Sequence, residues 1–225
     1  MADAEGLRIQ LPHGGSVSAL LDVPPSPWAC YVFAHGAGAG MQHAFMAQMA
    51  AGLAQRGVAV MRFQFPFMEQ ASRRPDAPAV AQAAVRAAVQ AAAARLPGVP
   101  LFAGGKSFGG RMSSQAQAAQ ALPRVCGLVF VGFPLHPAGK PSTRRGDHLA
   151  DVQVPMLFLQ GTRDALADLG RVREVLVPLG TRATLQVAEG ADHAFHVLAR
   201  SGRTDADVRE QLCDAVAAWM RPLIG

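Results

Sequence analysis

The chain has 225 residues, of which 50% are hydrophobic and 16% are charged. This balance excludes an intrinsically disordered chain, and the length suits a single α/β domain over residues 1–225 with a large buried core. The net charge of +5 comes almost wholly from arginine, without a dense basic run or interleaved aromatic residues, so nucleic-acid binding is disfavoured.

The first residues and the cysteines bear on where the protein works. Residues 1–6 have neither the basic start nor the apolar core of a secretion signal, and no apolar run approaches the roughly 18 residues of a membrane span. Cys30, Cys126 and Cys213 are widely spaced and show no metal-binding or redox pattern. We therefore expect a cytoplasmic protein with reduced thiols, no metal, no cofactor and no membrane contact.

The apolar pattern predicts strands that alternate with helices. Strands are expected at residues 7–11, 17–23, 28–34, 58–65, 125–133, 155–160 and 183–187, and in a run that begins at residue 100. Helices are expected at residues 45–53, 80–96, 169–176 and 208–219, and in the alanine-rich segment after residue 111. Residues 66–78 and 134–151 are expected to be irregular. Such alternation predicts an α/β fold, with a mostly parallel sheet and helices on both faces.

One stretch carries a catalytic pattern. Residues 105–109, Gly-Lys-Ser-Phe-Gly, fit G-x-S-x-G, the nucleophile elbow, and they stand between an apolar run and a helical segment as that motif requires. The glycines two residues before and after Ser107 let the strand and the helix pass closely at a sharp, strained turn. The pattern predicts Ser107 as a nucleophile, whereas Lys106 is expected to face solvent.

The same letters suggest a second interpretation, because Gly105-Lys106-Ser107 also ends a phosphate-binding P-loop. That motif needs a further glycine at the position of Pro100, and proline has no amide N–H to offer a phosphate. In addition, the strand after the helix runs into Gly132-Phe133 rather than a magnesium-binding acid. Both features count against nucleotide binding.

A serine hydroxyl needs a base, and the base is normally a histidine held by a carboxylate. In this kind of sheet the three residues follow strands in the order serine, acid, histidine. Ser107, Asp164 and His193 meet that order, which predicts a nucleophile, an orienting acid and a general base.

Several neighbours offer alternatives to this assignment. Asp168 or Asp192 could be the acid, and His196 could be the base, although it lies farther from its strand. Ser113 and Ser114 are expected to be ordinary positions on the helix after the elbow.

Two further groups of residues are candidates for substrate contacts. The amides of Phe108 and Ala37 are the expected oxyanion donors, and the competing interpretation of the loop at residues 35–38 is a plain glycine turn. Arginines in carboxyl-end loops could ring the mouth of the site and attract anionic substrates, or be ordinary surface residues of an arginine-biased chain: Arg73, Arg74, Arg144, Arg145 and Arg163.

Over nearly its whole length the chain resembles the α/β-hydrolase family. The resemblance lies in residues 35–38, 104–111, 132–137, 160–164 and 190–193. More narrowly, the chain resembles a subgroup that contains testis-expressed hydrolase-like proteins, the hydrolase-like subunit of the histone-acetylating NSL complex and bacterial relatives, and residues 132–137 are the stretch most particular to that subgroup. A broader likeness to dienelactone-hydrolase-like proteins rests on the triad order, with serine here where those enzymes carry cysteine.

These observations predict a serine hydrolase of small carboxylic esters or thioesters that acts through an acyl-enzyme. The alternative is an inert hydrolase-like scaffold that binds a partner protein, since some members of the subgroup serve as such. Residues 134–155 are too few for a helical cap domain, so we expect an open site. The sequence leaves open the acyl group, the leaving group and whether the protein forms a homodimer.

Overall fold

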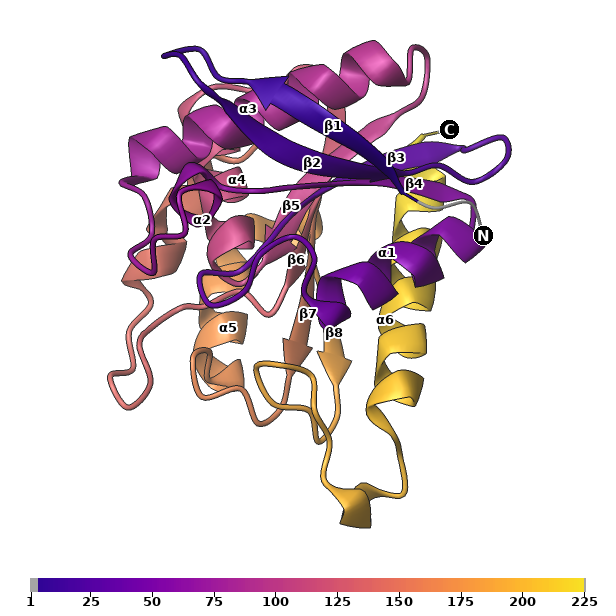
Figure 1. Cartoon of the computed structure of the whole chain (residues 1–225). Helices are drawn as coiled ribbons and strands as arrows, with labels where there is room; N and C mark the ends of the chain where they lie inside the picture. Colours follow the sequence, from indigo (N-terminus) through magenta and orange to yellow (C-terminus); the bar gives the residue numbers. More distant parts are fainter. Residues whose placement is uncertain (1–3, 225) are drawn as a thin grey trace.

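The structure, a computed structural model, describes residues 4–224. Within them, eight strands form one sheet in the order β1-β2-β4-β3-β5-β6-β7-β8 (Figure 1). Strand β2 pairs antiparallel with β1 and β4, whereas every later neighbour is parallel. The strands are β1 (Glu5–Gln10), β2 (Ser16–Asp22), β3 (Ala29–Ala34), β4 (Val58–Phe63), β5 (Leu101–Lys106), β6 (Val125–Val131), β7 (Met156–Gly161) and β8 (Ala183–Ala188).

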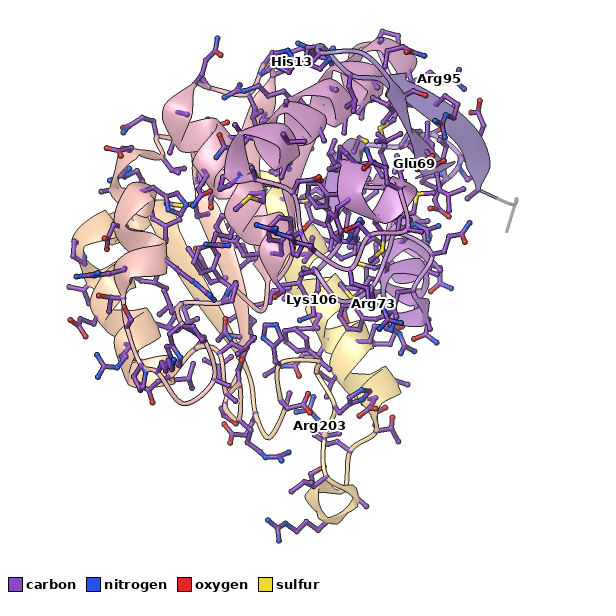
Figure 2. All side chains as sticks on the ribbon, turned by 60° about the vertical axis from the view of Figure 1, so that its left-hand side comes forward. His13, Glu69, Arg73, Arg95, Lys106 and Arg203 are labelled. Atoms are coloured by element: carbon purple, nitrogen blue, oxygen red, sulfur yellow. The ribbon has the colours of Figure 1, made fainter. Side chains whose placement is uncertain are left out.

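Helices cover both faces of this sheet, and side chains fill the space between the layers (Figures 1 and 2). Helices α1 (Ala44–Gln55) and α6 (Asp205–Met220) lie on one face. Helices α3 (Pro78–Arg95), α4 (Phe108–Ala119) and α5 (Leu169–Leu176) lie on the other. The sheet and both helix layers match the prediction from the apolar pattern.

Strand β3 shows how the central strands join two cores. All six of its residues are buried, and successive side chains point to opposite faces. Cys30 and Val32 belong to the core under α3 and α4, whereas Tyr31 and Phe33 belong to the core under α1 and α6. A strand with water on neither side must be apolar throughout, which is why this run lacks polar alternation.

The two segments expected to be irregular contain short helices. The first begins with α2 (Pro66–Glu69), a single turn that starts at a proline. The second ends with the 3₁₀ helix η1 (Arg144–Asp151), which contacts α4 and buries its Gly146 and Leu149. Elements this short lack the repeated apolar spacing that sequence analysis needs.

No part of residues 4–224 forms a separate cap domain, as the short segment after β6 predicted. Within the same residues, no helix combines the length and the apolar character that crossing a membrane requires. The carboxyl ends of β3, β5, β7 and β8 therefore open directly onto loops at one edge of the sheet, where ligands bind in open α/β folds.

Candidate active site

Ser107 lies at the sharp turn between β5 and α4, with φ 51° and ψ −114°. A non-glycine residue rarely adopts a positive φ, and such strain costs about 1–3 kcal/mol. The flanking glycines make the turn feasible. A Cβ on Gly105 or Gly109 would lie 2.4 or 2.5 Å from the carbonyl oxygen of Ala34, which is too close for any side chain. The elbow geometry inferred from the motif is therefore present.

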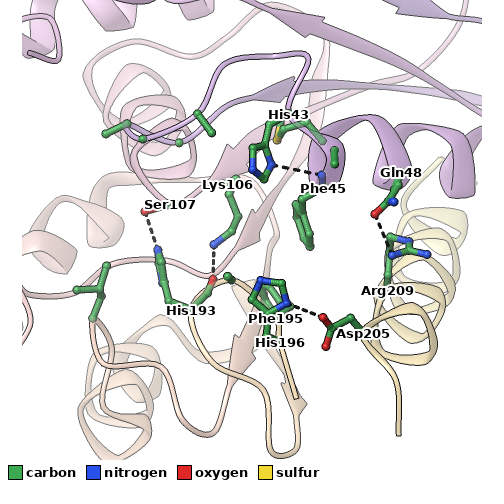
Figure 3. A pocket seen from close by; sticks show the side chains of 18 residues that line it. His43, Phe45, Gln48, Lys106, Ser107, His193, Phe195, His196, Asp205 and Arg209 are labelled. Atoms are coloured by element: carbon green, nitrogen blue, oxygen red, sulfur yellow. Dashed lines mark hydrogen bonds and ion pairs between the residues drawn. The ribbon is translucent and has the colours of Figure 1, made fainter. Parts of the chain in front are cut away.

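The three residues predicted from strand order lie in one hydrogen-bonded chain. The Oγ atom of Ser107 is 2.9 Å from Nε2 of His193, and Nδ1 of His193 is 2.7 Å from Oδ2 of Asp164. Figure 3 shows the first of these contacts at the edge of a pocket. Residues 86 positions apart in the sequence thus meet at the same edge of the sheet.

The surroundings of Asp164 fix the proton positions along this chain. Its side chain is fully buried, and it accepts hydrogen bonds from Nε2 of Gln160 and the backbone N–H of Leu166. A carboxylate in such a donor set accepts from the imidazole, so Nδ1 of His193 carries the proton. Nε2 of His193 is then free to accept the proton of Ser107.

The rival residues have other partners. Oδ1 of Asp168 caps α5 by accepting from the N–H of Arg171, as Asp commonly does at a helix start. Oδ1 of Asp192 accepts from two backbone N–H groups of its own turn. His196 pairs through Nδ1 with Asp205, 2.5 Å away, rather than with a serine.

Ser113 and Ser114 lie within α4, as expected, and both hydroxyl groups donate to backbone carbonyl oxygens of that region.

The two amides predicted to be oxyanion donors lie at the start of α4 and in the loop after β3. The N–H of Phe108 belongs to the first residue of α4, and Ala37 lies in the loop after β3 and lines the pocket. Neither amide donates a hydrogen bond to another residue of the described chain. Backbone N–H groups left free at a helix start are suited to an anion.

The loop that carries Ala37 is held by the buried His35. Its Nε2 accepts from the N–H of Phe65, so Nδ1 carries the ring proton and donates to the carbonyl of Gly36. Burial lowers the pKa of His35 to about 4, against opposing backbone contacts. The imidazole is therefore neutral near pH 7, and its two hydrogen bonds link the loop after β3 to the segment after β4.

A cavity of about 570 Å³ opens beside the Ser107–His193 pair. Its walls are mainly apolar, and polar groups stand at a few points, which is usual for a small-molecule site. The lining residues are Gly36, Ala37, Gly38, Ala39, His43, Ala44, Phe45, Met46, Gln48, Lys106, Ser107, Leu166, His193, Ala194, Phe195, His196, Asp205 and Arg209.

The expectation that Lys106 faces solvent is wrong. Its ammonium group donates to the carbonyl oxygen of His193 and lies 5.4 Å from the ring centroid of Phe195. A Cβ at Gly132 would come within 3.0 Å of Nζ, so the small residue leaves room for the group. Burial lowers the pKa of Lys106 to about 8, while the charges of Asp164 and Asp192 oppose that shift.

The predicted arginines take no part in the cavity wall. Arg73, Arg74, Arg144 and Arg145 are not among the lining residues, and Arg163 donates to the carbonyl of Gly190. A role for these side chains at the mouth stays a prediction. The arginine that does line the cavity is Arg209, on α6. No strand end or glycine-rich loop adjoins it in the sequence, so sequence reasoning missed it.

The parallel sheet, the strand-to-helix turn at Ser107 and the strand-end positions of Asp164 and His193 define the α/β-hydrolase fold. The chain belongs to the alpha/beta hydrolase domain family, whose sequence profile matches residues 27–221.

Solved structures of three bacterial proteins share this fold. An α/β serine hydrolase without a lid from Xanthomonas campestris is 24% identical, with 97% of this chain and 96% of that chain covered and a TM-score of 0.74. A dienelactone hydrolase from Anabaena variabilis is 18% identical, with 97% and 96% covered and a TM-score of 0.79. The esterase domain of a Rhodothermus marinus protein is 18% identical, with 100% of both chains covered and a TM-score of 0.75.

Proposed function

We propose that this protein is a serine hydrolase that cleaves small carboxylic esters or thioesters through an acyl-enzyme. The observation that carries the proposal is the hydrogen-bonded chain Ser107–His193–Asp164 at the wall of an accessible cavity. A serine hydroxyl hydrogen-bonded to an imidazole that is itself oriented by a buried carboxylate is the arrangement that activates an oxygen nucleophile.

In the first half-reaction, Oγ of Ser107 attacks the substrate carbonyl carbon while Nε2 of His193 takes the hydroxyl proton. The carbonyl oxygen becomes an oxyanion that accepts from the N–H groups of Ala37 and Phe108. The tetrahedral intermediate then expels the alcohol or thiol, which receives its proton from His193. Asp164 stays ionised throughout and stabilises the imidazolium.

In the second half-reaction, water gives a proton to His193 and attacks the acyl group on Ser107. Collapse of the new intermediate releases the carboxylic acid and returns the proton to Oγ. Lys106 contributes by position, because its hydrogen bond to the carbonyl of His193 ties the loop of the base to the strand that precedes the nucleophile.

The finer placement within the family is also a proposal. The residues at 132–137 favour the subgroup of testis-expressed and NSL-complex hydrolase-like proteins. The widely spaced cysteines favour a cytoplasmic location. The names esterase and dienelactone hydrolase belong to the structural neighbours, and they support ester chemistry in general rather than one substrate.

Labelling with a fluorophosphonate probe tests the proposal, because the probe reacts only with an activated serine. The native protein should be labelled at Ser107, as located by peptide mass spectrometry, and should hydrolyse p-nitrophenyl butyrate. Ser107→Ala should lose both properties. Ser114→Ala is the matched control, since Ser114 also contacts a histidine, and it should keep both. A protein without labelling and without turnover would instead be an inert scaffold.

A further inference from the structure

The cavity changes character along its length. Ser107, His193 and Lys106 stand at one side of the pocket in Figure 3, and Gln48 and Arg209 stand at the other. Between them in this view lie Phe45 and Phe195, whose rings stack with centroids 5.9 Å apart. A ligand that reaches from the reacting carbonyl to the far side therefore passes an apolar wall and ends beside a cation.

Arg209 is oriented but only partly satisfied. Its Nη1 donates to Oε1 of Gln48 at 3.0 Å, so a neutral amide from α1 holds the guanidinium in place. No carboxylate among residues 4–224 lies within 4.0 Å of Arg209. A guanidinium has five N–H donors, so most of them remain for a ligand.

The carboxylate that lines the cavity together with Arg209 is already engaged. Asp205 precedes Arg209 by one helical turn, but its Oδ2 pairs with His196 and its Oδ1 accepts from the N–H of Val197. Both oxygens of this carboxylate thus hold the loop before α6. Among the lining residues Lys106 and Arg209 are the cations and Asp205 is the carboxylate. The charges of Asp164 and Asp192 act on Lys106 at the near side, so the cation of the far side is Arg209.

We propose that the substrate is an ester or thioester with an aliphatic chain that ends in a carboxylate, and that Arg209 binds this carboxylate. The inference rests on the proposed function, because the reacting carbonyl is placed at Ser107. A planar guanidinium matches a carboxylate in two parallel hydrogen bonds, and the apolar wall favours methylene groups between the two polar ends. Arg209 is thus a specificity-determining residue.

The test compares kcat/KM for carboxylated and neutral esters of equal chain length in two arms. The acyl arm uses mono-p-nitrophenyl esters of dicarboxylic acids against p-nitrophenyl alkanoates. The alcohol arm uses acetate esters of ω-hydroxy acids against alkyl acetates. Chain length varies in each arm, because the preference should peak where the chain spans the cavity.

In one arm, Arg209→Gln should lower the ratio of carboxylated to neutral kcat/KM about tenfold, and neutral esters should change less than about twofold. Arg209→Lys should recover part of the preference, since it keeps the charge without the planar fork. The matched control is Arg203→Gln. Arg203 lies in the loop that leads into α6 and bonds Gln211 and the carbonyl of Glu189, away from the cavity wall (Figure 2).

An unchanged ratio in both arms for a folded Arg209→Gln overturns the proposal, as does an equal fall in Arg203→Gln. Thermal melting of each variant establishes that it is folded, and Arg209→Lys serves if Arg209→Gln is not. Failure of the proposed function looks different, because Ser107→Ala would then hydrolyse both kinds of ester at the native rate.

Discussion

Among residues 4–224, two serine side chains are hydrogen-bonded to a histidine, and only one of these pairs has the surroundings of a nucleophile. Ser107 and His193 are 2.9 Å apart at the cavity, and Ser114 and His148 are 2.7 Å apart between α4 and η1. The shorter contact belongs to the pair whose serine is buried. The distance between a hydroxyl and an imidazole is therefore no guide to nucleophilicity by itself.

The direction of the hydroxyl proton separates the pairs. Oγ of Ser114 donates its one proton to the carbonyl oxygen of Arg111. Nε2 of His148 must therefore carry a proton and donate it to Oγ of Ser114. His193 has the opposite tautomer, because the carboxylate of Asp164 holds the proton on Nδ1. Only the second arrangement leaves a lone pair aimed at a hydroxyl proton.

Access and charge reinforce this difference. Ser114 is fully buried within a helix, whereas Ser107 projects from a strained turn at the cavity wall. Burial, followed by the charge of Arg111, lowers the pKa of His148 to about 4. A histidine that resists protonation so strongly is a poor proton shuttle, and an enclosed serine meets no substrate.

The largest expected effect concerns the two histidines. His193→Ala should reduce kcat/KM on p-nitrophenyl butyrate by about 10⁵-fold or more, because the triad acts as a unit. His148→Ala should stay within about threefold of the native rate when assayed well below its melting temperature, and so should His196→Ala. Comparable losses in His148→Ala and His193→Ala would remove the distinction between the pairs.

The next effect concerns the carboxylate that sets the tautomer. Asp164→Asn should reduce kcat by about 10⁴-fold while the fold persists, because an amide can favour the wrong imidazole tautomer. The matched control is Asp168→Asn, since asparagine also caps a helix and the N-cap bond in α5 survives. An Asp164→Asn protein within tenfold of native kcat would show that this carboxylate does not control the base.

The sequence predicted the positions of Ser107, Asp164 and His193, because the signals for them are local. The elbow can be recognised in the sequence because it requires two glycines. Gly105 and Gly109 lie against the carbonyl of Ala34, where no other residue fits. Strand-end positions then bring Asp164 and His193 together, since parallel strands end at one edge of the sheet. Asp164 was preferred to Asp168 because it lies closer in the sequence to the end of its strand, and therefore closer to the edge of the sheet where Ser107 and His193 lie.

What the sequence did not predict depends on contacts between distant elements. Arg209 reaches the cavity because α6 packs beside α1, where Gln48 holds it. Lys106 turned inward because the loop that carries His193 passes over it and Gly132 leaves space. A long charged side chain next to a motif carries no local signal of its direction, so the default expectation of solvent was wrong.

A smaller effect is expected from the cation that supports the base. Lys106→Met should lower kcat about tenfold to hundredfold, the range for loss of a hydrogen bond to a charged group, with little change in KM. The reason is that the loop of His193 loses its tie to the elbow. Lys140→Met is the matched control, because Lys140 is exposed and is the other lysine of the chain. Native kcat in Lys106→Met would contradict the positioning role.

The smallest expected effect is on stability as a function of pH. Burial lowers the pKa of Lys106 from 10.5 to about 8 in the folded protein, so between these values the unfolded chain binds more protons than the folded one. The contribution of Lys106 to the free energy of unfolding must then rise as the pH rises from 8 to 10.5, and it must be constant below pH 8. Urea unfolding of native protein and of Lys106→Met at pH 7.5, 9 and 10 measures it as the difference between the two unfolding free energies.

The unfolding free energy of the native protein should rise relative to that of Lys106→Met as the pH increases, because methionine has no proton to lose. Other groups that titrate in this range, such as the buried thiols of Cys30 and Cys213 with their raised pKa values, are common to both proteins and cancel. The same series on Lys140→Met should give a flat difference. A flat or reversed trend for Lys106→Met would mean that the ammonium group of Lys106 keeps its ordinary pKa in the folded protein and stays in contact with water beside the loop of His193.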